Sequence, residues 1–231
     1  NEETGEREKK LSMHDLNGHD FIVRNANKTD LDQLMSLEQS WPPDQRAEVG
    51  QFLARLELFP EGFLVGEYQG TIIASTTTCL AHYNPEDLSG FNSWNKATNN
   101  GYLHPRADIT DPNALYVVST IVKKEFRGRG LLEAFHKIRR KLALKLGVDY
   151  LLTGAILPGY GAYCARHGEI SAYEYACLRQ NGIPIDPLLG KLALLGYELT
   201  DEKHLIANYY QSTESRDYAA LLVCRLTSGT Q

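Results

Sequence analysis

The stretch KKEFRGRGLLEAF, residues 123–135, changes from a charged, glycine-containing run to an apolar one within a few positions. Arginine and glycine alternate at positions 127–130, and the apolar residues after them recur at helical spacing to about residue 146. A continuous apolar run, NALYVVSTIV at 113–122, predicts a buried strand directly before it, and VDYLLTGAI at 148–156 predicts another after the helix. Strand, glycine-rich turn, helix and strand in this order are typical of a βαβ unit.

The alternating arginines and glycines suit an anion. The first turn of a helix leaves backbone N–H groups without intrahelical partners, and its dipole favours negative charge. Glycines let a phosphate approach that backbone closely, and Arg127 and Arg129 add positive charge. A pyrophosphate site is therefore one interpretation, and a charged turn without a ligand is the other. An RNA-binding tract is disfavoured because no low-complexity sequence surrounds the segment.

Composition excludes several classes of protein. The 231 residues are 42% hydrophobic and 23% charged, as in a globular protein. A net charge of −5 argues against a broad basic surface for nucleic acid, and no apolar run approaches the roughly 20 residues that span a membrane. Four widely spaced cysteines predict reduced thiols and a cytoplasmic protein. Cys79, His82 and His104 could be drawn as a zinc site, but their spacing does not demand one, so no metal is predicted.

The remaining elements predict one mixed α/β domain over residues 21–231, after a flexible leader at 1–20. A first strand is expected at 21–26, helices within 27–41 and 44–59, and a hairpin at 62–80 that turns at Gln69 and Gly70. An irregular excursion with a short helix follows at 84–112. A tyrosine-rich helix is expected within 162–182, a helix entering a strand at 186–199, and a last strand at 217–226.

The strand, the segment EFRGRGLL and the amphipathic helix together resemble the coenzyme A-binding motif of the GNAT superfamily of N-acyltransferases. The usual motif is Arg or Gln, two residues, Gly, one residue, and Gly or Ala. Arg127 and Gly130 match it, while Leu132 stands where the last small residue is usual. The order of elements from about residue 20 to 226 resembles the superfamily too. The resemblance implies an α/β (α+β) fold with a mixed, mostly antiparallel central sheet, flanking helices and splayed central strands.

The resemblance also implies where acyl-CoA, with acetyl-CoA first, would bind as co-substrate. The thioester end would lie near Val118 to Thr120. The residues implied in binding coenzyme A are Thr120, Ile121 and Val122 along the pantetheine arm, and Arg127, Gly128, Arg129, Gly130 and Leu131 at the pyrophosphate.

Three later segments resemble a narrower group. GAILPGY (154–160), IDPLLGKLALLGYEL (185–199) and NYYQSTESRDYAALL (208–222) are similar to GNAT domains fused to carbon–nitrogen hydrolases. More distantly, the chain resembles decarboxylating GNAT-like domains that load polyketide assembly lines. That branch uses a threonine, which Thr153 matches, and a histidine, whose place is taken by Lys191.

The implied function is transfer of a short acyl group from coenzyme A to a small-molecule or peptide amine by direct attack. One alternative is a malonyl-CoA decarboxylase that acts with an acyl carrier protein. Another is a domain that binds coenzyme A without catalysis. Nucleic acid and membranes are not expected as partners.

The catalytic residues are less clear, because Leu192 occupies the place of the usual GNAT tyrosine acid. Tyr160, Tyr163 and His167 follow the strand that the resemblance places at the thiol end, and with Thr153 they are the catalytic candidates. A packing role remains the alternative for each tyrosine. Covalent catalysis is disfavoured because no base partner for Ser119 or Cys164 is visible in the sequence.

Overall fold

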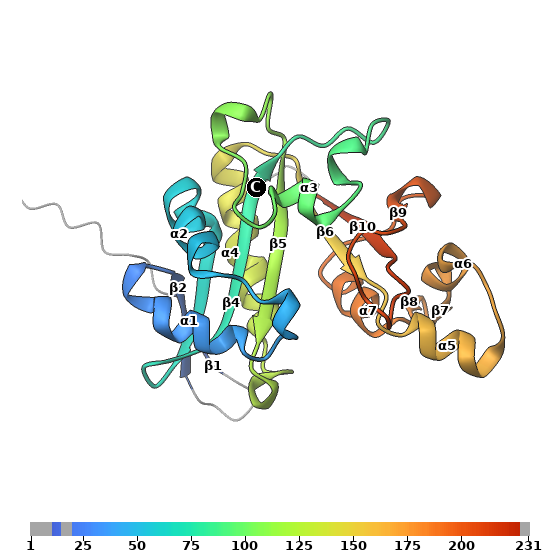
Figure 1. Cartoon of the computed structure of the whole chain (residues 1–231), viewed down its shortest axis with the longest axis horizontal. Helices are drawn as coiled ribbons and strands as arrows, with labels where there is room; N and C mark the ends of the chain where they lie inside the picture. Colours follow the sequence, from blue (N-terminus) through green and yellow to red (C-terminus); the bar gives the residue numbers. More distant parts are fainter. Residues whose placement is uncertain (1–10, 15–19, 227–231) are drawn as a thin grey trace, which may run out of the picture. The chain divides into compact units, whose positions relative to one another are not determined.

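The structure, a computed structural model, describes residues 11–14 and 20–226, with side chains from residue 21 (Figure 1). The described residues divide into two compact units. The N-terminal unit holds the chain up to Thr77 together with Ser119–Arg139, and the C-terminal unit holds Thr78–Val118 and the chain from Arg140 onward. Strands β4 and β5 each have residues in both units, and the hydrogen-bonded order is β1-β2-β3-β4-β5-β6-β10-β9. The predicted mixed, mostly antiparallel α/β fold is confirmed.

The strands are β1 (Leu11–His14), β2 (Asp20–Asn25), β3 (Phe63–Tyr68), β4 (Thr71–Ala81), β5 (Ala114–Val122), β6 (Tyr150–Ile156), β7 (Arg179–Gln180), β8 (Ile183–Pro184), β9 (Leu205–Ile206) and β10 (Ala219–Arg225). The α-helices are α1 (Leu31–Glu38), α2 (Val49–Leu58), α3 (Trp94–Thr98), α4 (Leu131–Leu146), α5 (Tyr160–His167), α6 (Ala172–Cys177) and α7 (Pro187–Ala193).

The N-terminal unit contains the predicted hairpin of β3 and β4. Gln69 and Gly70 both have positive φ, 49° and 77°, which is the geometry of a two-residue turn that matches strand twist. Antiparallel β2 pairs with β3, and β1 pairs with β2. The strand at β1 was not expected, because residues 1–20 were predicted as a flexible leader. Asp20 of that range begins β2, and residues 1–10 and 15–19 lie outside the described residues.

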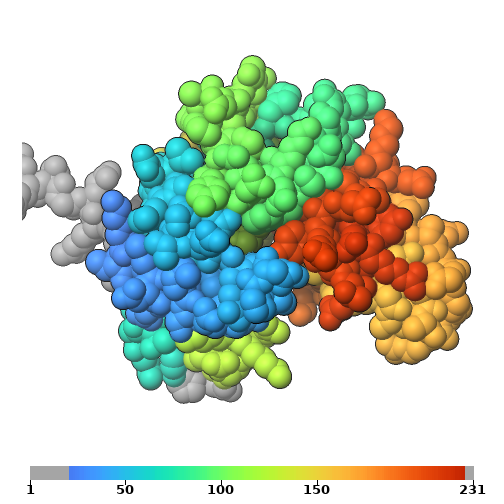
Figure 2. Space-filling model, in the orientation of Figure 1, coloured from blue at the N-terminus to red at the C-terminus, as the bar shows by residue number. Residues whose placement is uncertain are grey.

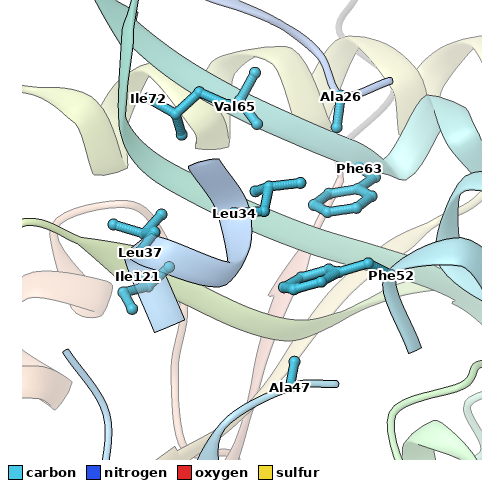
Figure 3. Packing of buried hydrophobic residues seen from close by; sticks show 9 residues of the cluster. All are labelled: Ala26, Leu34, Leu37, Ala47, Phe52, Phe63, Val65, Ile72 and Ile121. Atoms are coloured by element: carbon cyan, nitrogen blue, oxygen red, sulfur yellow. The ribbon is translucent and has the colours of Figure 1, made fainter. Parts of the chain in front are cut away.

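Two apolar clusters hold this unit together. In the first, α1 and α2 cover one face of the sheet, and the rings of Phe52 and Phe63 stack 5.7 Å apart (Figure 3). Leu34 and Ile121 complete this cluster from α1 and β5. The blue atoms of β2, α1 and the loop after it form one continuous surface in Figure 2. In the second cluster, the first turns of α4 pack on β3 and β4.

The start of α4 fits against β3 because Gly66 has no side chain. A Cβ built at Gly66 would lie 2.8 Å from Cδ2 of Leu131 and 3.3 Å from Cβ of Ala74. Leu131 is only 2% exposed, so its side chain has little room to move. The helix that follows the arginine–glycine loop thus approaches β3 closely at the contact of Leu131 with Gly66.

Gly66→Ala should therefore lower the free energy of unfolding by about 1–3 kcal/mol, the usual cost of overpacking a core. Leu131→Val removes the clashing Cδ2, so Gly66→Ala should cost less in that background. Urea unfolding of the two single variants and the double variant measures the coupling. Equal costs of Gly66→Ala in both backgrounds would contradict the explanation.

The C-terminal unit contains the parallel pair of the predicted βαβ unit. β5 and β6 pair from Ala114 with Tyr150 to Val117 with Thr153, and β10 lies antiparallel on the other side of β6. This parallel register is short, from Ala114 to Val117 on β5, and the expected splay of the central strands stays a prediction.

Two predictions for this unit were wrong. The tyrosine-rich segment forms two helices, α5 and α6, because Gly168 at φ +93° ends the first. The strand expected after α7 is reduced to an isolated bridge between Glu198 and Val223, and the short β9 pairs with β10 instead.

Candidate functional site

The arginine–glycine loop owes its path to two glycines. Gly128 and Gly130 have φ of +75° and +85°, and a Cβ built at either would meet no atom within 4 Å. Their backbone conformation requires glycine, and the space beside them is open. The N–H of Ala134 donates to the carbonyl of Gly130 at 2.9 Å, so the amides of the preceding helical residues lie outside the α-helical hydrogen-bond ladder. An open cradle of backbone amides results.

The side chains of Arg127 and Arg129 bring two positive charges to this loop. Arg127 is exposed, and its Nε donates to the carbonyl of Val122, the last residue of β5, at 3.2 Å. The guanidinium of Arg129 lies 5.1 Å from the centre of the Phe126 ring. Positive charge and helix N-terminal amides at one place suit a phosphate or pyrophosphate.

The strand before the loop buries most of its side chains. Ile121 belongs to the cluster between the sheet and α1–α2, and Val122 packs against the cluster under α4. Thr120 is half-buried and carries a hydroxyl 2.8 Å from that of Thr76. Of the three residues predicted along the pantetheine arm, Thr120 therefore has a polar side chain, while the side chains of Ile121 and Val122 pack in the two apolar clusters.

In the C-terminal unit, two tyrosines not singled out from the sequence meet where the β5–β6 register ends. The buried hydroxyls of Tyr116 and Tyr209 are hydrogen-bonded to each other. A Cβ at Gly154 of β6 would lie 2.3 Å from the Tyr209 hydroxyl oxygen, so glycine there makes room for the ring. The indole of Trp94 donates to the carbonyl of Val118 at 2.8 Å. The sequence signal for this close packing is Gly154, a glycine inside the strand predicted at 148–156.

Gly154→Ala should destabilise the protein by about 1–3 kcal/mol, because the added methyl overlaps the Tyr209 ring. The penalty should shrink when Tyr209 is also alanine. Chemical denaturation of both singles and the double would test this. An unchanged penalty in the Tyr209→Ala background would mean that the ring is not what excludes a side chain.

Burial raises the pKa of both hydroxyls, of Tyr116 well above its ordinary value and of Tyr209 as well. In an unfolded chain tyrosine ionises near pH about 10. Above that pH the unfolded chain loses protons that the folded protein keeps, so stability must fall as pH rises.

Tyr209→Phe should make the urea midpoint fall less steeply than the wild type's between pH 9.5 and about 11, since one buried titrating group is gone. Identical slopes for Tyr209→Phe and wild type would refute the assignment.

The predicted catalytic residues have different surroundings. Tyr160 is buried, and its hydroxyl donates to the carbonyl of Ile170 at 2.8 Å, an arrangement that suits packing. Tyr163 is half-buried on α5, and its ring lies 4.6 Å from that of the exposed His167. Thr153 is half-buried on β6, where it closes the parallel register with Val117. The structure thus brings Tyr163 and His167 together.

The carboxylate of Asp186 joins two of the three late segments that resemble hydrolase-fused GNAT domains, 154–160 and 185–199. Asp186 is 1% exposed. One of its oxygens accepts from the N–H of Gly159 and the hydroxyl of Tyr175, each at 3.0 Å. The other caps α7 through the amides of Leu188 and Leu189. The LPGY and IDPLLG segments are thereby tied to α6.

Further features concern metals and thiols. In the described part of the chain, no group of three or more His, Cys, Asp or Glu residues is arranged to hold a metal ion. All four cysteines are free; three are buried as expected of structural thiols, whereas Cys177 is exposed. No helix between residues 20 and 226 is long and apolar enough to cross a bilayer.

No family model matches the chain, but solved structures of other proteins share its fold. The loading GNATL domain of CurA from Lyngbya majuscula superposes with a TM-score of 0.72 at 18% identity, over 89% of this chain and 97% of that one. The fold is GNAT-like. The GphF GNAT-like decarboxylase, solved with isobutyryl-CoA, superposes with a TM-score of 0.67 at 23% identity over 88% and 98%.

Sequence relatives agree with this GNAT fold. The uncharacterized N-acetyltransferase YkwB of Bacillus subtilis is 29% identical over 93% of each chain. The probable hydrolase YhcX of the same organism is 25% identical over 87% of this chain, which spans only 38% of that longer protein. The resemblance to the GNAT superfamily, including domains joined to a hydrolase and polyketide-loading domains, is confirmed.

Proposed function

We propose that this protein is an acyl-CoA-dependent N-acyltransferase that moves a short acyl group, with acetyl first, to an amine. The observation that carries the proposal is the open cradle at the N-terminus of α4, where Gly128 and Gly130 take positive φ beside two arginines. A pyrophosphate suits this cradle, because glycine has no side chain to keep a phosphate away from the backbone amides. A side chain at either position would also strain the backbone that presents these amides. The 29% identity to an N-acetyltransferase over 93% of the chain supports the reaction class.

Bound acyl-CoA would supply an activated thioester. Transfer to an amine forms a C–N bond and breaks the C–S bond, while the amine gives up one proton and the sulfur gains one. We propose Tyr163 or Thr153 as the proton donor, because the hydroxyl of Tyr160 already donates its proton to the carbonyl of Ile170. Leu192, at the usual tyrosine position, is 8% exposed and has no proton to give.

The first test is coenzyme A binding by calorimetry. Arg127→Glu should weaken binding at least about tenfold, because a charge-assisted contact to phosphate is replaced by repulsion. Lys137→Glu makes the same charge change on an exposed part of α4 and should leave affinity within about twofold. Absence of coenzyme A binding by the wild type would overturn the proposal.

A second candidate function is malonyl-CoA decarboxylation with transfer to an acyl carrier protein. Thr153 favours it, because it lies half-buried on the strand where the decarboxylating branch has its threonine. Exposed Lys191 opposes it, because it stands at that branch's histidine.

Mass spectrometry after incubation with acetyl- or malonyl-CoA separates the candidates. The N-acyltransferase gives an acylated amine only when an amine from a test panel is present. The decarboxylase releases carbon dioxide from malonyl-CoA without amine, and Thr153→Val abolishes that release. Binding without any turnover would leave a non-catalytic coenzyme A-binding domain.

A further inference from the structure

The segment RQNGIP, residues 179–184, folds into the small hairpin of β7 and β8. Asn181 and Gly182 both have positive φ, 53° and 79°, and an Asn-Gly pair in this conformation makes a two-residue turn that matches strand twist. Arg179 pairs with Pro184 across the hairpin. Directly opposite residues of an antiparallel pair share a face, so these two side chains lie on the same face.

That face of the hairpin borders a cleft of about 310 Å³. Arg179 and Pro184 line the cleft, whereas the other pair of the hairpin, Gln180 and Ile183, faces away from it. Helix α7 forms the neighbouring wall and packs closely on the hairpin, since a Cβ at Gly190 would lie 2.9 Å from the carbonyl oxygen of Pro184. The described residues that line the cleft all belong to the C-terminal unit. Its volume is at the lower end of the range for small-molecule sites, about 300–1,000 Å³.

The walls of the cleft are largely apolar. Leu189 and Ala193 line it from α7, and Leu222 lines it from β10. Leu189 and Leu222 are each 2% exposed, so they form its floor. A ligand in this cleft therefore needs an apolar part to cover these side chains.

Glu198 also lines the cleft, but with its backbone. Its N–H donates to the carbonyl of Val223 at 3.0 Å, and its carbonyl accepts from the N–H of Val223 at 2.9 Å. This antiparallel bridge puts the side chains of Glu198 and Val223 on one face of the sheet. Leu222 is on the other face, because side chains alternate along a strand. Among the described lining residues, Arg179 is thus the one that brings a charged side chain to the cleft.

The guanidinium of Arg179 is held at the wall of the cleft. Its Nη1 donates to the carbonyl of Ala176 at 2.6 Å and to that of Leu178 at 3.1 Å, where α6 ends. Ala176 is itself a lining residue. Both hydrogens of Nη1 are used in this way, and in the part of the chain that the structure describes Nε and Nη2 have no hydrogen-bond partner. These two nitrogens present parallel N–H groups, the fork that fits the two oxygens of a carboxylate.

We propose that this cleft binds a small monocarboxylate with an apolar tail. Its carboxylate pairs with Nε and Nη2 of Arg179, and its tail covers Leu189 and Leu222. One guanidinium neutralises one carboxylate, whereas a phosphate monoester carries about −1.5 to −2 charges at pH 7 and would leave negative charge unpaired against apolar walls. This second ligand site does not rest on the proposed function, because the arginine–glycine loop belongs to the other unit.

Calorimetry without coenzyme A tests the site, with hexanoate as the probe. Hexanoate should bind, and butanoate, which has two fewer CH₂ groups, should bind about tenfold more weakly, since each buried CH₂ strengthens binding about threefold to fourfold. Hexanamide and hexyl phosphate keep the tail and change the head group. Each should bind at least about fivefold more weakly than hexanoate.

Arg179→Gln removes the fork, so it should weaken hexanoate binding at least about fivefold and leave hexanamide within about twofold. Arg166→Gln is the matched control, because Arg166 is an exposed arginine of the same unit whose Nε donates to the carbonyl of Ala162 at 3.2 Å, outside the cleft. It should leave both affinities unchanged. If Arg179→Gln does not fold, the comparison of hexanoate with hexanamide on the wild type still decides.

Four results would overturn the proposal. The first is a wild type that does not bind hexanoate up to about 10 mM, whatever its affinity for coenzyme A. The second is equal affinity for hexanoate and hexanamide, since the carboxylate would then not be recognised. The third is a hexanoate affinity that Arg179→Gln leaves unchanged, because the ligand would then lie elsewhere. The fourth is tighter binding of hexyl phosphate than of hexanoate, which would make the ligand a phosphate.

Discussion

The parallel hydrogen bonding between β5 and β6 stops at Val117 and Thr153, and the strand residues that follow on β5 lead to the candidate phosphate site. In a continuous parallel sheet both edges of each strand are occupied, and buried strands of this kind have no backbone to offer a ligand. Here β5 runs five residues beyond the last pair before it ends at Val122. Those residues lead directly into the arginine–glycine loop. The part of β5 beyond its pairing with β6 is therefore followed at once by the N-terminus of α4.

Glycines in this protein do two different jobs. At Gly128 and Gly130 the backbone has positive φ and the surroundings are open, so glycine serves conformation. At Gly66, Gly154 and Gly159 the backbone is ordinary and the surroundings are full, so glycine admits a neighbouring side chain. The sequence alone does not distinguish these cases. Only the first kind points toward a ligand, and the second kind explains why distant segments pack as they do.

Sequence reasoning recovered the parts of the fold that local patterns control. The hairpin at Gln69 and Gly70, the amphipathic α4 and the strand β5 all follow from turn chemistry and apolar periodicity. The end of α5 at Gly168 was not predicted, because tyrosines on both sides of this glycine made the whole segment look like one helix. The strand expected at Glu198 was missed because pairing partners are set by tertiary structure.

The candidate site divided along the same line. The arginine–glycine loop and its place at the start of a helix were predictable, since both depend on neighbours in the chain. The pair of Tyr116 and Tyr209 was not, because 93 residues separate two hydroxyls that meet only in the folded protein.

The carboxylate of Asp186 has a consequence for how the chain can vary. It binds the amide of Gly159 just before α5 and the amides that open α7, so it holds together the two ends of an excursion of some two dozen residues. The entropy of closing a loop rises only slowly with its length, so an insertion in an exposed part of this excursion should cost little while both anchors stay paired. Tyr175 of α6 donates to the same carboxylate oxygen as Gly159, so any such change must also keep α6 in place.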